Sequence, residues 1–338
     1  MIDSFRLVDS FNRKLDYLRV SITDRCNLRC VFCMPSCGVE WKPHDSMLTF
    51  EEILRTVRIM AELGVRKIKV TGGEPLLRKG TASFLGKLKA TAGIEKVTLT
   101  TNGLLLDKYL EEAETLGQAS LPDGVNISLD ALNPERFSRI TRADKLSPVN
   151  VLASIDRLHE KQVLVKVNCV PIRGLNEEDI VPLAALARGK KIVVRFIELM
   201  PLGSAVDYKP VSGSETAGII EKAFGTLEPF FGIESNGPAV YYSLPGFAGK
   251  IGFINPISHG FCESCNRLRL TSEGSLKLCL SSSLEFNLRD LLRSGISDAE
   301  LANNIVEFVA KKPRVHTLSG VYGEYEEPKT GGMFEIGG

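Results

Sequence analysis

The sequence has almost no net charge and few cysteines for its length. The 42 Lys and Arg residues are balanced by 41 Asp and Glu, which leaves a formal net charge of +1 over 338 residues. Non-specific attachment to nucleic acid or to an anionic membrane needs a global basic excess. We therefore expect neither partner, and any anion site must come from local clustering of cations.

Long hydrophobic segments are also missing. No stretch approaches the roughly 18 uninterrupted apolar residues of a membrane span, and the first ten residues, MIDSFRLVDS, contain no apolar run of signal-peptide length. With 43% hydrophobic and 25% charged residues, the composition is that of a soluble globular protein with a substantial core. These features predict a cytoplasmic protein.

The eight cysteines are too few for a disulfide scaffold in a chain of this length, and they are unevenly spaced. Grouped thiols in a reducing compartment indicate metal binding. Cys169 lies on the apolar side of a predicted strand and is expected in the core, while Cys37 is either incidental or an adventitious ligand. The two groups are Cys26, Cys30 and Cys33, and Cys262, Cys265 and Cys279.

Between residues 16 and 198, short β-branched runs alternate with longer helical stretches. A helix is expected at 50–63, where Thr49 and Glu52 form a capping box and Gly64 follows the end. Repeated strand–helix units indicate a parallel sheet with right-handed crossovers. Six units suit either an incomplete barrel or an open doubly wound sheet. The predicted strands are 17–22, 67–71, 96–100, 125–129, 163–169 and 192–197.

Side chains along these strands alternate between an apolar and a polar set. Strands covered by helices on both faces should instead be apolar throughout, and a closed barrel would fill its interior with branched aliphatics. The pattern therefore favours an α/β fold built on an incomplete (β/α)6 TIM-type barrel with a polar lumen. Members of the polar set include Arg19, Lys69, Thr100, Asn126, Lys166, Asn168 and Arg195.

Beyond Met200 the sequence changes to segments that carry Gly, Pro and Ser. We expect the chain to divide into a barrel over residues 1–225 and a C-terminal α+β region over residues 226–338. The predicted elements of that region are a hairpin with strands at 267–271 and 275–280, a helix starting near Asn287 and a helix at 298–311.

The first thiol group forms the motif CxxxCxxC directly after the first predicted strand. Three thiolates in a short loop can hold one iron–sulfur cubane and leave its fourth iron open to chemistry. A closed zinc site with Cys37 or His44 as fourth ligand is an alternative. We favour the cubane because active sites gather at the carboxyl ends of barrel strands.

CxxxCxxC with Phe32 before the third cysteine resembles the radical S-adenosylmethionine superfamily. The resemblance implies an incomplete (β/α)6 barrel, a 4Fe–4S cluster on Cys26, Cys30 and Cys33, and S-adenosylmethionine on the open iron. In that superfamily the reduced cluster cleaves S-adenosylmethionine, and a 5′-deoxyadenosyl radical takes a hydrogen atom from the substrate. The residues so assigned to S-adenosylmethionine are Phe32, where close relatives usually carry Tyr, Gly73 of a GGEP segment, Ser128 and Met200. Alternatively, GGEP is a plain loop, and Ser128 and Met200 serve packing.

The second thiol group has the spacing CxxC, thirteen residues, then Cys. A structural zinc site would need a fourth ligand, for which His259 is the nearest candidate. Together CxxxCxxC, GGEP and CxxCNRLR resemble the GTP 3′,8-cyclase family of molybdenum cofactor biosynthesis along essentially the whole chain, as do RFIELM, TTNG and the terminal Gly-Gly. This resemblance implies a second 4Fe–4S cluster on Cys262, Cys265 and Cys279, whose open iron binds the guanine of GTP.

The cationic members of the polar set agree with a triphosphate ligand, because buried like charges need a neutralising anion. Separate surface ion pairs are the alternative. The tail should enter the lumen, where Gly337 and Gly338 would help to organise the site and the terminal carboxylate would pair with Arg195 or Lys166. By the resemblance, the GTP contacts are Arg19, Lys69 (often Arg in relatives), Thr100, Lys166, Arg267, Leu268 and Arg269.

The resemblance implies a lyase reaction in which the 3′ hydrogen of GTP is abstracted and the sugar carbon then attacks C8 of guanine. The product would be 3′,8-cyclo-7,8-dihydroguanosine 5′-triphosphate. The expected partners are the downstream cyclic pyranopterin monophosphate synthase and a reductant such as flavodoxin or ferredoxin. Two other hypotheses are a peptide-modifying radical enzyme, whose auxiliary clusters generally use more cysteines, and a zinc-stabilised binding module.

Overall fold

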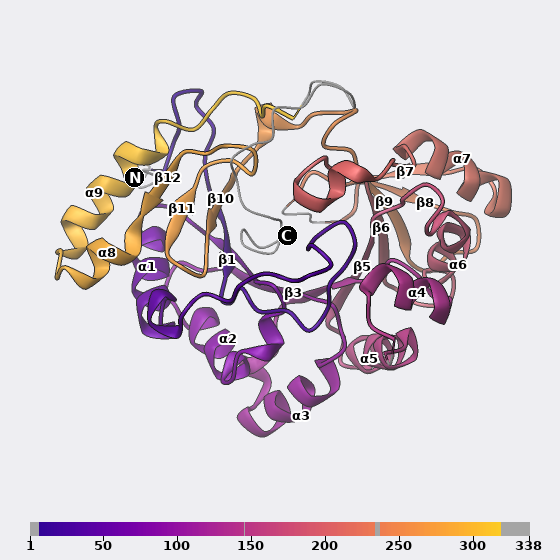
Figure 1. Ribbon diagram of the computed structural model, residues 1–338, viewed down its shortest axis with the longest axis horizontal. Coiled ribbons are helices and arrows are strands. Elements are labelled where there is room, and N and C mark those ends of the chain that lie inside the picture. The colour runs from indigo at the N-terminus through magenta and orange to yellow at the C-terminus, as the bar shows by residue number, and fades with distance from the viewer. Residues whose placement is uncertain (1–6, 145, 234–236, 319–338) are drawn as a thin grey trace.

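The computed structural model describes residues 7–144, 146–233 and 237–318, and its strands form a single sheet (Figure 1). The strands of the N-terminal half are β1 Tyr17–Ser21, β2 Lys67–Thr71, β3 Lys96–Thr101, β4 Gly124–Ser128, β5 Leu164–Cys169 and β6 Val193–Ile197. Those of the C-terminal half are β7 Glu228–Phe230, β8 Val240–Ser243, β9 Lys250–Ile254, β10 Arg267–Leu270, β11 Ser275–Lys277 and β12 Glu285–Asn287. Their order in the sheet is β12-β11-β10-β1-β2-β3-β4-β5-β6-β9-β8-β7.

Helices connect the strands of the first half. Figure 1 shows α1 to α6 in an arc on the outer side of β1 to β6. Within the described ranges, no helix is both long and apolar enough to cross a membrane. The helices are α1 Phe50–Glu62, α2 Thr81–Lys89, α3 Leu106–Leu116, α4 Pro134–Thr141, α5 Pro148–Glu160, α6 Ile180–Ala185, α7 Gly213–Phe224, α8 Leu288–Arg293 and α9 Asp298–Val309.

Strands β1 to β6 pair in chain order, and every pair is parallel. All six lie where the sequence predicts them, with each end within one residue. Helix α1 begins at the expected capping box, in which the Thr49 hydroxyl accepts from the Glu52 N–H at 3.1 Å and the Glu52 carboxylate accepts from the Thr49 N–H at 2.7 Å. Gly64 follows the helix with a φ of 119°. The prediction of an α/β fold with a parallel sheet is confirmed.

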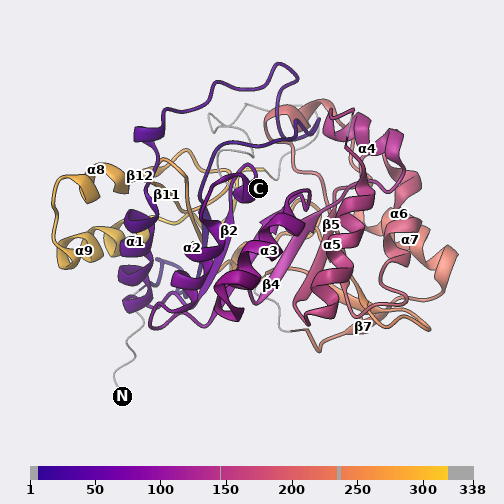
Figure 2. The same ribbon diagram turned by 90° about the horizontal axis from the view of Figure 1, so that it is seen from below.

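The C-terminal half extends this sheet at both edges, which the sequence analysis did not predict. Strand β10 pairs in parallel with β1, and β9 pairs in parallel with β6. Antiparallel partners then continue outward, β11 and β12 from β10 and β8 and β7 from β9. Figure 2 shows α8 and α9 at one end of the molecule and β7 at the other.

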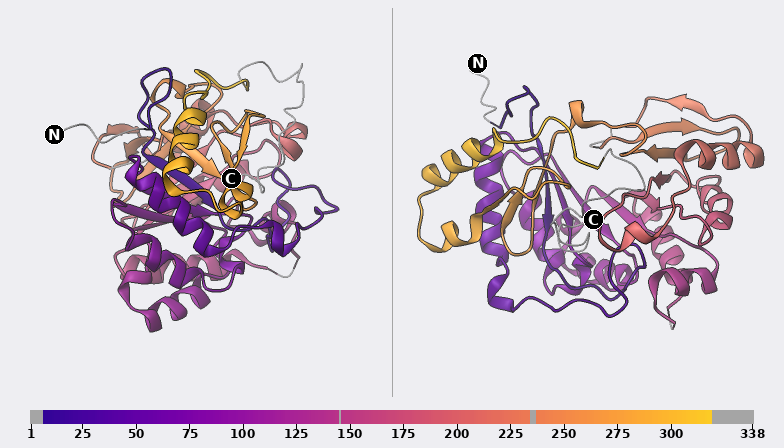
Figure 3. Two further views of the ribbon diagram at one scale, coloured as in Figure 1. Left: turned by 90° about the vertical axis from the view of Figure 1, so that its left-hand side faces the viewer. Right: turned by 45° about the horizontal axis from the view of Figure 1, so that its top comes forward.

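The predicted C-terminal elements are present with small differences. β10 and β11 form the expected hairpin, but β11 ends at Lys277 rather than residue 280, because the chain bends there into the turn that carries Cys279. Helix α8 is capped by Asn287, and α9 lies beside α1, where the Arg55 guanidinium donates to Asp298 at 2.8 Å (Figure 3).

The core lies between the sheet and the outer helices. The apolar set of the predicted alternation fills it, with Leu18, Val20 and Ile22 all 0% exposed. Cys169 is equally buried, as predicted, whereas Cys37 is exposed. Since successive side chains of a strand point to opposite faces, the polar set faces the inner side of the sheet.

Candidate active site

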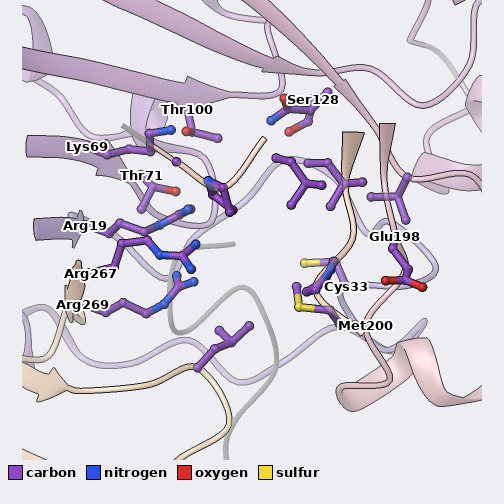
Figure 4. Close-up of a pocket in the computed structure, with 18 of the residues that line it drawn as sticks. Arg19, Cys33, Lys69, Thr71, Thr100, Ser128, Glu198, Met200, Arg267 and Arg269 are labelled. Atoms are coloured by element: carbon purple, nitrogen blue, oxygen red, sulfur yellow. The ribbon is translucent and has the colours of Figure 1, made fainter. Parts of the chain in front are cut away.

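Both thiol groups and most of the predicted cationic residues line one cavity of about 360 Å³. Figure 4 shows side chains from several strands pointing into it from different sides. Gly337 and Gly338 lie outside the described residues. The predicted site residues that line the cavity are Cys26, Cys30, Phe32, Cys33, Gly73, Ser128, Met200, Arg19, Lys69, Thr100, Arg195, Cys262, Cys265, Arg267, Arg269 and Cys279.

Two predicted GTP contacts do not line this cavity. Leu268 is 0% exposed and lies in the core, next to Leu18 in the register of β10 and β1. Its side chain points to the opposite face from its cavity-lining neighbours on β10, so only its backbone remains available to a nucleotide. Lys166 lies two residues before the cavity-lining Asn168, with its Nζ 5.8 Å from the centre of the Tyr241 ring.

The first thiol group lies in the loop after β1. Cys33 and Met34 both donate their N–H to the Cys30 carbonyl, at 2.9 and 3.0 Å, which bends the loop around the thiols. Burial raises the pKa of the Cys26 thiol to about 11 and holds that of the Cys30 thiol well above its usual value. Iron must therefore displace protons from these thiols when it binds.

The chemistry of the donor set fits a cubane better than a single metal ion. Among the described residues, no three His, Cys, Asp or Glu side chains converge on one point as a mononuclear site requires. A cubane attaches each thiolate to a different iron, so three spaced thiols in one loop suit it. His44 does not line the cavity, and neither does Cys37.

The GGEP segment packs directly on the loop that carries the first thiol group. Gly73 donates its N–H to the Thr23 carbonyl at 2.8 Å, and Glu74 donates to the Arg25 carbonyl at 2.7 Å. A Cβ on Gly73 would lie 2.4 Å from the Arg25 carbonyl oxygen, and one on Gly72 would lie 2.7 Å from that of Thr23. The two glycines are therefore required by the close approach of the two loops, in addition to any contact with a ligand.

Replacing Gly73 with Ala should displace the first thiol loop, because the Cβ meets backbone that cannot rotate away. We expect a loss of about 1–3 kcal/mol in the free energy of unfolding and lower iron occupancy of the first site. Gly218→Ala is the matched control, since nothing lies within 4 Å of its Cβ position on helix α7, and it should be neutral or stabilising. Urea unfolding and iron analysis measure both effects, and a Gly73→Ala chain that matches the control would contradict this account.

Glu74 of the GGEP segment is hydrogen-bonded to the TTNG segment. Its carboxylate is 0% exposed and accepts from the Thr101 hydroxyl and the Asn102 N–H, each at 2.7 Å, and from the Leu76 N–H at 3.0 Å. Burial raises the pKa of this carboxyl to about 7. The residue joins the loops after β2 and β3, a connection that the sequence analysis did not predict.

The second thiol group comes from two segments. Cys262 and Cys265 flank a tight turn before β10, where Cys265 donates its N–H to the Cys262 carbonyl at 3.1 Å. Cys279 follows β11. Burial would raise the pKa of the Cys265 thiol, but the charges of Arg267 and Lys312 lower it to about 7. His259, the alternative zinc ligand, contacts Ser258 and does not line the cavity.

A cationic wall faces the cavity from three neighbouring strands. Arg269 of β10, Arg19 of β1 and Lys69 of β2 are adjacent in the sheet register. Figure 4 shows the guanidiniums of Arg19, Arg267 and Arg269 directed the same way. Burial and then the neighbouring Arg19 lower the pKa of Lys69 well below its usual value. In the part of the chain that the structure describes, no carboxylate forms an ion pair with Lys69 or Arg267, which weighs against separate surface pairs.

Arg195 is held by amides. Its Nε donates to Asn168 at 2.9 Å and its Nη2 to Asn126 at 2.6 Å, and the Asn126 amide donates to the Thr100 hydroxyl at 3.3 Å. Gly252 on β9 leaves room for this side chain, since a Cβ there would lie 3.1 Å from the Arg195 Cγ. The two asparagines belong to the polar set of their strands, which was the signal available in the sequence.

The wall of the cavity across from the arginines carries sulfur and carboxylate groups instead of cations. Glu198 and Met200 lie there with Cys33 (Figure 4). The Glu198 carboxylate accepts from the backbone N–H groups of Ile257 and Ser258 at 2.9 and 3.0 Å. One side of the cavity is thus cationic, while the other offers sulfur and carboxylate groups.

Comparison with known protein families agrees with this geometry. Residues 20–187 match the radical SAM superfamily, and residues 192–318 match the Molybdenum Cofactor Synthesis C family. Among solved structures, SuiB of Streptococcus suis has a TM-score of 0.57 at 17% identity, over 88% of this chain and 69% of that protein. At this identity the similarity supports the fold alone.

Similarity to curated proteins extends over almost the whole chain. The GTP 3′,8-cyclase of Clostridium perfringens strain SM101 is 43% identical over 330 residues, covering 98% of this chain and 99% of that protein. The GTP 3′,8-cyclase of Desulforamulus reducens is 43% identical over 316 residues, 92% of this chain and 95% of the relative. Molybdenum cofactor biosynthesis protein 1 of Dictyostelium discoideum is 41% identical over 98% of this chain but 52% of its own length. The chain belongs to the GTP 3′,8-cyclase family of the radical S-adenosylmethionine superfamily.

Proposed function

We propose that this member of the family converts GTP into 3′,8-cyclo-7,8-dihydroguanosine 5′-triphosphate in molybdenum cofactor biosynthesis. The observation that carries the proposal is that two three-thiol groups and a cationic wall open into one cavity. A radical enzyme needs its cluster and substrate in one enclosed space, where positioning and exclusion of water protect the reactive species.

Two 4Fe–4S clusters and S-adenosylmethionine are the proposed cofactors. Cys26, Cys30 and Cys33 would hold the first cluster, and Cys262, Cys265 and Cys279 the second. When bound, the first cluster and S-adenosylmethionine supply a 5′-deoxyadenosyl radical that removes the 3′ hydrogen of GTP. The proposed S-adenosylmethionine contacts are Phe32, Gly73, Ser128 and Met200.

The cationic wall is the proposed triphosphate site. Guanidinium groups offer bidentate donors to phosphate oxygens, and Arg19, Arg267 and Arg269 present three of them from adjacent strands. Thr100 and the Arg195 network lie farther along the same surface and would orient the nucleoside. The second thiol group is next to this wall, since the Arg267 guanidinium lies 3.6 Å from the Cys265 Sγ. By the family resemblance, the guanine would face the second cluster.

The wider architecture is proposed on the same basis. The six parallel strands and their outer helices would form an incomplete (β/α)6 barrel over residues 1–225, with residues 226–338 as the auxiliary-cluster region. The product would pass to cyclic pyranopterin monophosphate synthase, and a flavodoxin or ferredoxin in the cytoplasm would supply electrons.

GTP that carries deuterium at C3′ tests the proposal. Under anaerobic conditions, the label should appear in 5′-deoxyadenosine, because the hydrogen atom moves directly from substrate to cofactor. Mass spectrometry of the nucleoside measures it. Unlabelled 5′-deoxyadenosine would refute the mechanism, and turnover supported by a peptide but not by GTP would instead indicate a peptide-modifying enzyme.

GTP binding should weaken as the pH rises. A triphosphate beside Lys69 favours the charged ammonium and raises its lowered pKa, so binding takes up a proton at pH values between the pKa of the free protein and that of the complex. Affinity should be greatest below this interval and fall within it by up to about tenfold per pH unit. Lys69→Arg keeps its charge and should reduce the slope. Calorimetric titrations from about pH 6 to about pH 9 compare the two proteins, and equal slopes would contradict the role of Lys69.

A further inference from the structure

The segment after α9 contacts every part of the chain that carries the second thiol group. We call residues 312–317 the brace. Lys312, the first residue of the brace, contacts the segment that follows Cys265 and the segment that precedes Cys279. The Pro313 and Arg314 carbonyls of the brace and the Cys262 carbonyl all accept hydrogen bonds from Arg13. The hairpin of β10 and β11 joins the two stretches of sequence that carry the cysteines, and the brace adds hydrogen bonds next to the cysteines at its open end.

Arg13 joins the brace to the first of these stretches. Its Nη1 donates to the Cys262 carbonyl at 2.7 Å and to the Arg314 carbonyl at 2.9 Å, and its Nη2 donates to the Pro313 carbonyl at 2.6 Å. The Asp9 carboxylate accepts from Arg13 Nε at 2.5 Å and fixes the guanidinium from behind. Arg13 is 8% exposed, so its side chain is largely shielded from bulk water, and the bonds that it donates to the brace are partly buried.

Lys312 joins the brace to the second stretch. Its Nζ donates to the Arg267 carbonyl at 3.0 Å and to the Leu278 carbonyl, one residue from Cys279. Farther along, the Thr317 N–H donates to the Ser281 hydroxyl at 3.2 Å, and that hydroxyl lies 3.6 Å from the Cys279 Sγ. The brace therefore holds Cys279 from both sides along the chain.

Burying the charged ammonium of Lys312 destabilises the fold unless a negative charge lies beside it. The side chain is 3% exposed and lines the cavity, and no carboxylate among the described residues forms an ion pair with it. Backbone carbonyls satisfy its donors but carry no formal charge, and an unpaired buried ammonium destabilises a fold. Thiolates attached to a cluster would supply the missing negative charge beside it.

We infer that Arg13 and Lys312 are positioning residues that hold the second thiol group in the arrangement a cluster requires. The inference rests on the second cluster of the proposed function and adds residues to which that proposal gives no role. Partners that orient metal ligands typically change metal affinity by 10–100-fold when they are replaced. The hydrogen bonds of Arg13 and Lys312 described above go to the segments of the second thiol group, so the first thiol group should not respond.

The test uses the full chain with Cys26, Cys30 and Cys33 replaced by Ala, which leaves the second site as the one place for a cluster. After anaerobic reconstitution, an iron chelator is added and the loss of cluster absorbance is followed. In this background Lys312→Met and Arg13→Lys should lose the cluster about 10–100-fold faster than the parent. Lys311→Met is the matched control, because Lys311 is the exposed neighbour of Lys312, and it should match the parent.

A second measurement separates positioning from simple destabilisation. Without metal, Lys312→Met should unfold at the same urea concentration as the parent or a higher one, because an uncompensated charge is removed from the interior. Rapid loss of the cluster without loss of apo-protein stability supports the inference. If both Lys312→Met and Arg13→Lys lost the cluster at the parent rate, the positioning inference would be refuted while the proposed second site stood. If the parent bound no iron, both the inference and the proposed second site would be refuted.

Discussion

Replacing any one of Cys26, Cys30 and Cys33 with Ala should reduce reductive cleavage of S-adenosylmethionine to the background rate. These three thiols share one short loop at the carboxyl end of β1, and the loss of one opens a second iron and destabilises the cubane. The amount of 5′-deoxyadenosine formed with dithionite, with and without GTP, measures the effect. This is the largest change that we expect from a single substitution in the chain.

Two controls sharpen this result. Cys37→Ala should cleave S-adenosylmethionine at the parent rate, because Cys37 is exposed and does not line the cavity. Replacing Cys262, Cys265 or Cys279 should spare uncoupled cleavage while cyclisation of GTP is lost. If cleavage survived in the first set and failed in the second, the roles of the two thiol groups would be reversed.

Replacing Arg19 and Arg269 together with Met should weaken GTP binding by about 3–6 kcal/mol, since a hydrogen bond to a charged group contributes roughly 1.5–3 kcal/mol. That corresponds to a Kd on the order of 10²–10⁴-fold higher. These two arginines are preferable to Arg267, whose guanidinium also contacts the Cys265 Sγ at 3.6 Å. Met keeps much of the side-chain volume and leaves both thiol groups intact.

Equilibrium dialysis with GTP at about 0.15 M salt measures the change, because at that ionic strength distant charges are largely screened. Lys87→Met with Lys108→Met is the matched control. Both lysines are exposed on the outer helices α2 and α3, so this pair changes the net charge equally without touching the cavity. If the lysine pair lost as much GTP affinity as the arginine pair, net charge would explain the effect. If the arginine pair kept its GTP affinity, the triphosphate site would be refuted.

Local patterns in the sequence were sufficient to predict much of the secondary structure. Alternating side chains placed β1 to β6 within one residue, because a strand with one buried face must repeat with a period of two. The capping box at Thr49 marked the start of α1, since the hydrogen bonds of a helix terminus form between residues three apart. The two thiol groups were equally visible, because ligand spacing is a property of the local chain.

Contacts between distant segments were decided by the tertiary structure. Nothing local in Arg267–Leu270 or Lys250–Ile254 indicates that these strands join opposite edges of the first sheet, parallel to β1 and β6. The same holds for Arg13, whose partners at Cys262 and Pro313 lie about 250 and 300 residues away. Gly73 likewise shows its purpose only against the Arg25 carbonyl, where a Cβ would lie 2.4 Å away.

The alternation also had a limit that only the packed structure revealed. Leu268 alternates with two arginines in the sequence, and the assignment by resemblance grouped all three as GTP contacts. In the structure Leu268 lies in the core, so its side chain does not line the cavity. By itself, the sequence determined which residues face inward along each strand and which thiols lie together. The tertiary structure decided which strands are neighbours and therefore which inward residues share a cavity, because strand order depends on closing long loops and burying whole faces rather than on any local pattern.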